Sequence, residues 1–174
     1  MSRMTNATPA EVSAWLTNRL PDEWRAHSAP QITVDREEIV VLLAVSSPEI
    51  DDQATAAAAV DGRIAGFREE TRDRRISIAL EAEAMFDRKV SWGARCVDRT
   101  VIFTHLAAPV MTRLRQPERL VLDTLVSGGV ARSRSDALAW CVRLVGQHTG
   151  DWLEQLRTAL QDVDRVRAQG PESA

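Results

Sequence analysis

The segment that most limits the possible folds of this chain is residues 109–148, one short strand followed by two short helices. Side chains of the strand alternate between an apolar face and a more basic one: Val110, Thr112 and Leu114 against Met111, Arg113 and Arg115. A lone strand has no hydrogen-bonding partner, and about 40 residues make only a marginal core. The sequence therefore predicts a homodimer whose two strands pair antiparallel across a two-fold axis.

The two helices of this segment have clear boundaries in the sequence. Pro117 opens the first helix, which Gly128-Gly129 ends. Ser133 caps the second helix, and Asp136 follows three residues later. The side chains that we expect to form the dimer core are those on the inward faces: Val110, Thr112, Leu114, Leu122, Leu125, Leu138, Cys141 and Leu144.

The turn between the helices carries the most specific motif of the chain. The run from Gly129 to Leu138 has the pattern G-x-x-x-S-R-S-D-A-L, and it follows a Leu-x-x-Leu helix. The segment resembles the ribbon-helix-helix DNA-binding family, the group of the Arc and methionine repressors. Many members place a proline directly after the strand, whereas here Pro117 follows Leu114 by three residues.

This resemblance implies that the two-stranded ribbon enters the major groove of double-stranded DNA. Met111, Arg113 and Arg115 would then face the base edges, where an arginine fork matches guanine O6 and N7. The start of the second helix would contact a DNA phosphate through four residues, Arg132, Ser133, Arg134 and Ser135. The alternative is an ordinary solvated strand face and a helix cap with no ligand.

Residues 1–106 are predicted to form a small α+β domain of unknown role. Thr8, Pro9 and Glu11 have the spacing of a helix start, and the helix should end between residues 20 and 26. Two β-like runs follow at 32–34 and 39–45, with 35–38 either a turn or the continuation of one strand. The second run is apolar at every position, which indicates a central strand buried on both faces.

The remainder of this domain is predicted to be helical and then β. Residues 52–87 have helical spacing, with Asp61-Gly62 as a possible division, and strands follow at 89–97 and 100–105 around an Asp98-Arg99 turn. The stretch 63–75 contains five arginines and three acidic residues. A solvated face with i,i+4 ion pairs is one interpretation, and a phosphate-contacting face is the other.

The C-terminal residues 149–174 are predicted to form a helix and a tail. Leu153, Leu156, Leu160 and Val163 make an apolar stripe over 151–167. Gly170-Pro171 is a stop signal, and the last four residues should be disordered. The expected fold class is α+β, with domains at 1–106, 107–148 and 149–174.

Charge is unevenly distributed along the chain. The net charge is −3, yet residues 109–150 carry six arginines and three acidic residues. Of the 22 basic side chains only Lys89 is a lysine, which reflects either GC-rich codon usage or selection for binding. The whole-chain charge is therefore a poor guide to partners.

Several function classes have no support in the sequence. The longest apolar run has seven residues, whereas a membrane span needs about 20. There is no glycine-rich phosphate loop, no secretory signal, no metal-ligand spacing among the histidines and cysteines, and no catalytic constellation.

We expect a cytoplasmic, nucleoid-associated transcriptional regulator that is not an enzyme and has no cofactor or metal. Its N-terminal domain would bind a small-molecule or protein effector; the alternative is an antitoxin-like dimer whose N-terminal domain binds another protein.

Overall fold

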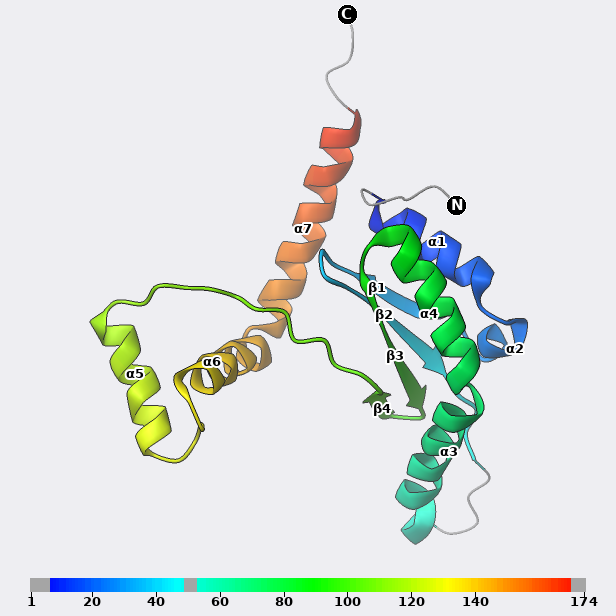
Figure 1. Cartoon of the computed structure of the whole chain (residues 1–174), viewed down its shortest axis with the longest axis horizontal. Helices are drawn as coiled ribbons and strands as arrows, with labels where there is room; N and C mark the ends of the chain where they lie inside the picture. The colour runs from blue at the N-terminus through cyan, green and yellow to red at the C-terminus, as the bar shows by residue number, and fades with distance from the viewer. Residues whose placement is uncertain (1–6, 49–52, 170–174) are drawn as a thin grey trace, which may run out of the picture. The chain divides into compact units, whose positions relative to one another are not determined.

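A computed structural model of the chain describes residues 7–48 and 53–169 (Figure 1). The chain divides after Pro109 into two compact units. Unit 2 holds three helices, α5 (Gln116–Ser127), α6 (Arg134–His148) and α7 (Gly150–Gln169). Unit 1 holds the elements α1 (Pro9–Arg19), α2 (Asp22–Arg25), β1 (Gln31–Val34), β2 (Glu38–Ala44), η1 (Gln53–Thr55), α3 (Ala56–Glu70), α4 (Arg72–Phe86), β3 (Lys89–Cys96) and β4 (Arg99–Ile102). The predicted α+β class is confirmed.

Unit 1 is built around a four-stranded sheet of order β1-β2-β3-β4. The two central strands are parallel, in a register that pairs Ile39 with Val90 and Leu43 with Ala94, and α3 and α4 form the crossover between them. The outer pairs are antiparallel. Residues 35–38 form a turn, because the Asp35 carboxylate accepts the Glu37 and Glu38 N–H groups at 2.8 and 2.7 Å.

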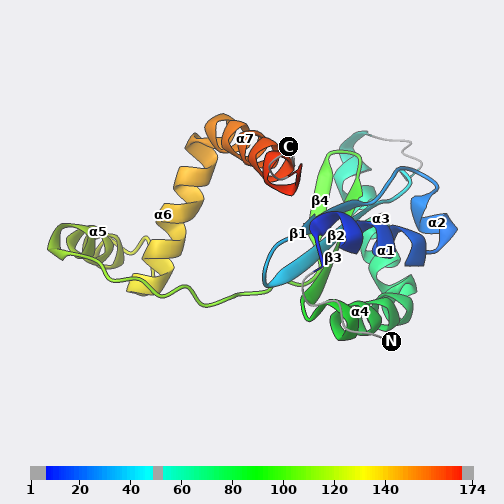
Figure 2. The same cartoon turned by 90° about the horizontal axis from the view of Figure 1, so that it is seen from above.

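The helices of unit 1 gather on one face of this sheet (Figure 2). Along β2, Ile39, Val41 and Leu43 are fully buried, whereas Val40 and Leu42 on the opposite face are half-buried. The prediction that this strand is buried on both faces was therefore wrong. The second face of β2 is not covered by a helix, because both crossover helices, α3 and α4, lie on the same side of the sheet as α1.

The long predicted helix 52–87 is two helices, and the break is not at Asp61-Gly62 but at Thr71. The Thr71 hydroxyl donates to the carbonyl of Phe67 at 2.5 Å, and the residue leaves the helical region with ψ near 0°. Asp87 ends α4 in the left-handed conformation, with φ of 56°. Gly62 lies inside α3, so the break falls at Thr71 and not at the glycine.

The predicted start of the first helix is confirmed, whereas the turn between the last two strands is displaced by one position. Thr8 and Glu11 form the expected capping box at the start of α1, with bonds of 2.8 and 3.3 Å. The β3–β4 turn lies one position earlier than predicted, at Val97 and Asp98, and Val97 has a positive φ of 54°. The predicted stop at Gly170-Pro171 and the disordered tail lie outside the described residues.

Gly93 lies in β3 where a side chain would collide with the neighbouring strand. A Cβ atom there would lie 2.7 Å from the Ile102 side chain and 2.8 Å from the Val101 carbonyl oxygen. We expect Gly93→Ala to lower the free energy of unfolding by about 1–3 kcal/mol. The control Gly62→Ala, in an open position of α3, should raise it by about 0.5–1 kcal/mol. Urea unfolding of both variants tests this, and a shift of the same sign in both would contradict it.

Candidate nucleic-acid interface

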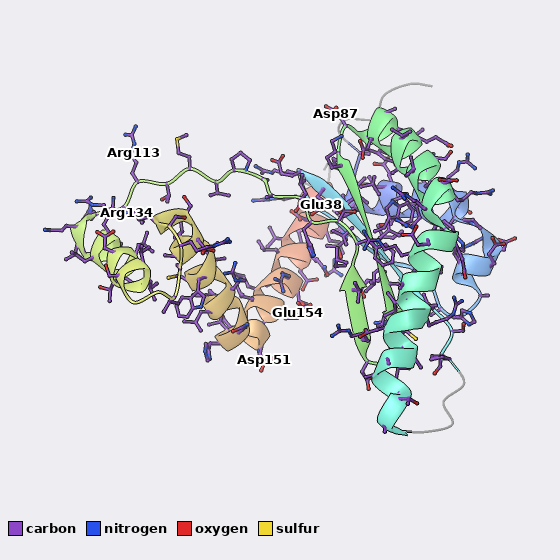
Figure 3. All side chains as sticks on the ribbon, turned by 60° about the horizontal axis from the view of Figure 1, so that its bottom comes forward. Glu38, Asp87, Arg113, Arg134, Asp151 and Glu154 are labelled. Atoms are coloured by element: carbon purple, nitrogen blue, oxygen red, sulfur yellow. The ribbon has the colours of Figure 1, made fainter. Side chains whose placement is uncertain are left out.

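The segment between β4 and α5 is extended and has no strand pairing within the described chain. The side chain of Val110 is 86% exposed and that of Met111 is 97% exposed. Arg113 projects from the segment away from α5 and α6 (Figure 3), and neither Arg113 nor Arg115 has an ion pair with any described residue. The predicted strand is thus extended backbone without a paired strand in one copy, and within it Leu114 packs on the α5–α6 helix pair while its carbonyl accepts a bond from Arg119 at 2.8 Å.

The helices α5 and α6 pack against each other over a small core. Three of its residues, Leu122, Ala131 and Ala137, are buried. The half-buried side chains that pack on them are Leu114, Leu125, Val126, Leu138 and Cys141. Of the predicted dimer-core residues, the structure brings Leu114, Leu122, Leu125, Leu138 and Cys141 together; Leu144 is half-buried, and Val110 and Thr112 are exposed.

The turn between these helices depends on Gly129. The N–H groups of Gly128 and Val130 donate to the carbonyls of Thr124 and Leu125, at 2.8 and 3.0 Å. Gly129 adopts φ of +73°, a conformation that costs a glycine little. This turn brings Ala131 back onto the helix pair, where it is buried.

The start of α6 has the predicted cap. The Ser133 hydroxyl accepts the N–H of Asp136 at 3.2 Å, and the Asp136 carboxylate accepts the N–H of Arg132 at 3.0 Å. The Arg132 side chain is 96% exposed, and its nearest carboxylate contact, to Asp136, is 3.8 Å. The cap fixes the direction in which the remaining N–H groups of the first turn point.

Arg134, predicted to contact a phosphate, has a partner that sequence reasoning missed. Its guanidinium donates two bonds to the Asp123 carboxylate on α5, at 2.6 and 2.8 Å. This bidentate pair ties the first turn of α6 to the middle of α5. The only signal in the sequence was an acidic residue on the polar face of the first helix.

Arg134 also lowers the pKa of the Asp123 carboxyl through its hydrogen bonds and its charge. A carboxylate with a lowered pKa stabilises the folded state above its unfolded pKa of about 3.9, and that contribution is lost as pH falls through the folded value. We expect wild type to be slightly more stable than Asp123→Asn at pH 7 and this difference to be smaller near pH 3, since an exposed pair contributes little and its contribution declines below the unfolded pKa. Unfolding curves at both pH values measure this; a difference that does not change with pH would contradict it.

Unit 2 leaves much apolar surface uncovered in a single copy. Its three helices and extended segment carry exposed large apolar side chains on every element: Val110, Met111, Leu120, Val121, Val130, Val142, Val145, Trp152, Leu156, Leu160, Val163 and Val166. Large contiguous apolar surfaces on a monomer mark interaction sites. The polar face of α7, by contrast, carries its own ion pairs, Arg157–Glu154 and Arg165–Asp162, both at 2.9 Å.

Other kinds of site find no support in the described ranges. No group of three or more His, Cys, Asp or Glu side chains gathers there as metal ligands would. None of the helices in residues 7–48 and 53–169 is both long and apolar enough to cross a membrane. Both cysteines are free thiols, with Cys96 buried in β3 and Cys141 half-buried in α6.

Comparison with known proteins places both units in families. Residues 10–102 match the Rv1265-like protein N-terminal domain, and residues 115–167 match the Mb1296 C-terminal domain. The chain is 54% identical over 158 residues to the uncharacterized proteins Mb1296 of Mycobacterium bovis and Rv1265 of Mycobacterium tuberculosis, covering 91% of this chain and 69% of each relative. No solved structure gives a significant match. The chain therefore belongs to the family of Rv1265-like proteins.

Proposed function

We propose that this protein is a homodimeric, sequence-specific DNA-binding protein of the ribbon-helix-helix type and acts as a transcriptional regulator. The observation that carries the proposal is the extended segment 110–115, in which residues 110–113 and Arg115 are exposed and Leu114 packs on the α5–α6 pair. In the proposed dimer, two copies of this segment pair antiparallel. The ribbon then supplies the backbone partners that each copy lacks alone.

Burial of apolar surface supports the dimer. Within one copy, the α5–α6 core contains three buried residues, Leu122, Ala131 and Ala137. A second copy would cover the apolar ribbon face, including Val110, and the outward apolar residues of α6, Val142 and Val145. Burying a valine side chain contributes about 1.5 kcal/mol or more, and a two-fold dimer gains each contribution twice.

The basic face of the ribbon supports DNA as the partner. Arg113 and Arg115 would project on the same side as Met111 and opposite to the covered apolar face. Their guanidinium groups have no carboxylate partner among the described residues, so contact with a base costs no existing ion pair. Each bidentate pair with guanine contributes about 1–3 kcal/mol of discrimination.

The α6 N-terminus supplies the proposed phosphate contact. The helix dipole and the N–H groups of its first turn, near Ser135, favour an anion there. Ser133 is already used as the cap, and Arg134 is held by Asp123, so these two residues would orient the site. Arg132, with its side chain 96% exposed, is the arginine best placed to reach a phosphate.

The proposal is tested by incubating the full chain with fragmented genomic DNA from its source organism and sequencing the fragments it retains. We expect a small set of fragments that share an inverted repeat, because a two-fold dimer reads two half-sites. Their affinity should fall as salt rises, since phosphate contacts release counterions. Retention of no fragment above background at low salt would refute DNA binding.

A further inference from the structure

Unit 1 contains a buried arginine that has no carboxylate partner. Arg75, in the first turn of α4, is 7% exposed, and no described carboxylate lies within 4 Å of its guanidinium. Its Nε donates to the Thr71 hydroxyl at 3.0 Å, and one terminal nitrogen donates to the Arg68 carbonyl at 2.6 Å. These bonds use two of the five N–H donors of a guanidinium and hold it in one orientation.

The guanidinium of Arg75 lies at a cavity of about 220 Å³. Its Cζ atom lies over the Phe103 ring, 4.8 Å from the ring centre, and the Cζ atom of Arg68 lies 5.6 Å from the same centre. The cavity is lined by Arg68, Glu69, Arg72, Arg75, Phe103 and Thr104. An aromatic ring from the end of β4 thus positions two arginines from the α3–α4 junction at one opening.

Positive charge around this cavity is not balanced within it. Three arginine side chains and one acidic side chain line the cavity. The acidic side chain is Glu69, whose carboxylate lies 3.9 Å from the Arg72 guanidinium. Burial lowers the pKa of Arg75, and the positive charge of Arg68 acts in the same direction. A structural capping role explains the bond to the Arg68 carbonyl but not the convergence of two more arginine side chains.

We propose that this cavity binds a small phosphate dianion, either inorganic phosphate or the terminal group of a phosphomonoester. The lining carries three positive charges and one negative charge, so a dianion neutralises it. Planar guanidinium groups are suited to bidentate contact with phosphate oxygens. A nucleic-acid backbone phosphate carries a single charge and is joined to sugars on both sides, which fits a cavity of about 220 Å³ less well.

The binding experiment uses the full chain and inorganic phosphate, followed by calorimetry and by amide chemical shifts in NMR spectra. We expect saturable binding with shifts at Phe103 and Thr104, weaker binding of acetate, and no shift of these two amides on addition of random duplex DNA. Equal affinity for acetate, or shifts at these amides with DNA alone, would overturn the proposal, as would the absence of saturable phosphate binding.

Substitutions locate the site. The double variant Arg68→Ala/Arg72→Ala removes two exposed cavity arginines and should weaken phosphate binding at least tenfold. The control Arg74→Ala/Arg95→Ala removes the same charge from exposed positions outside this cavity and should change affinity less than twofold. Equal weakening by both variants would show only general electrostatic attraction and would overturn the assignment.

A third variant probes the buried arginine itself. Arg75→Lys keeps the charge but loses the fork and the contact of its plane with the Phe103 ring, so phosphate affinity should also fall at least tenfold. Circular dichroism must show a folded chain for this variant to count; if it unfolds, the double variant of the exposed arginines still decides the question. All variants should retain DNA affinity in phosphate-free buffer, so this proposal and that of DNA binding fail separately.

Discussion

The double variant Arg113→Ala/Arg115→Ala should lose sequence-specific DNA binding while remaining a folded dimer. Both arginines are exposed and unpaired among the described residues, so their removal disturbs no intramolecular contact. If each makes a bidentate contact worth about 1–3 kcal/mol, loss of both in one protomer weakens binding at least about 30-fold. A dimer loses this contribution twice. Fluorescence anisotropy with a retained fragment, at fixed salt, measures the change.

The matched control for that variant is Arg157→Ala/Arg165→Ala on α7. It removes the same two positive charges, from exposed side chains whose partners, Glu154 and Asp162, lie on the same helix. We expect less than a threefold change in affinity, attributable to net charge alone. Equal losses in both variants would show that the ribbon arginines attract DNA without reading it.

Val110→Asp should dissociate the dimer. In one copy Val110 is 86% exposed, so the substitution costs the isolated chain almost nothing. In the proposed dimer this side chain enters the shared core, where an unpaired carboxylate costs several kcal/mol. We expect the dimer dissociation constant to rise at least 100-fold, measured by sedimentation equilibrium.

The neighbouring variant Met111→Asp is the control for position. Met111 is 97% exposed in one copy, and strand alternation places it on the opposite, DNA-facing side of the ribbon. We expect the dimer to persist in this variant and its DNA affinity to fall. Dissociation by Met111→Asp but not by Val110→Asp would reverse the assigned faces, and dissociation by neither would exclude pairing of this segment.

Local patterns in the sequence predicted much of the fold. Some signals depend on residues only a few positions apart, so the sequence pattern alone predicts them. These are the caps at Thr8 and Ser133, the turn glycines 128 and 129, and the apolar stripe of α7. The break at Thr71 falls inside a run with continuous helical spacing, so periodicity alone does not reveal it. The single covered face of β2 depends on where distant helices pack.

The candidate sites divide in the same way. Alternation along 110–115 assigns Arg113 and Arg115 to one face, and this assignment stays a prediction because residues 110–113 and Arg115 are all exposed in one copy. The Arg134–Asp123 pair joins two helices, and the cavity at Arg75 needs Phe103, 28 positions along the chain. The excess of arginine in 63–75 indicated a phosphate-contacting face as one alternative, but only the fold selects which of those arginines converge.

The most direct test of the account is DNA binding when guanine N7 is removed from the major groove. The tightest retained fragment is synthesised with 7-deazaguanine in the repeat, which deletes one acceptor of the arginine fork and leaves backbone charge unchanged. We predict at least a tenfold loss of affinity for wild type and almost none for Arg113→Ala/Arg115→Ala. Unchanged wild-type affinity would contradict reading of the major groove by the ribbon arginines.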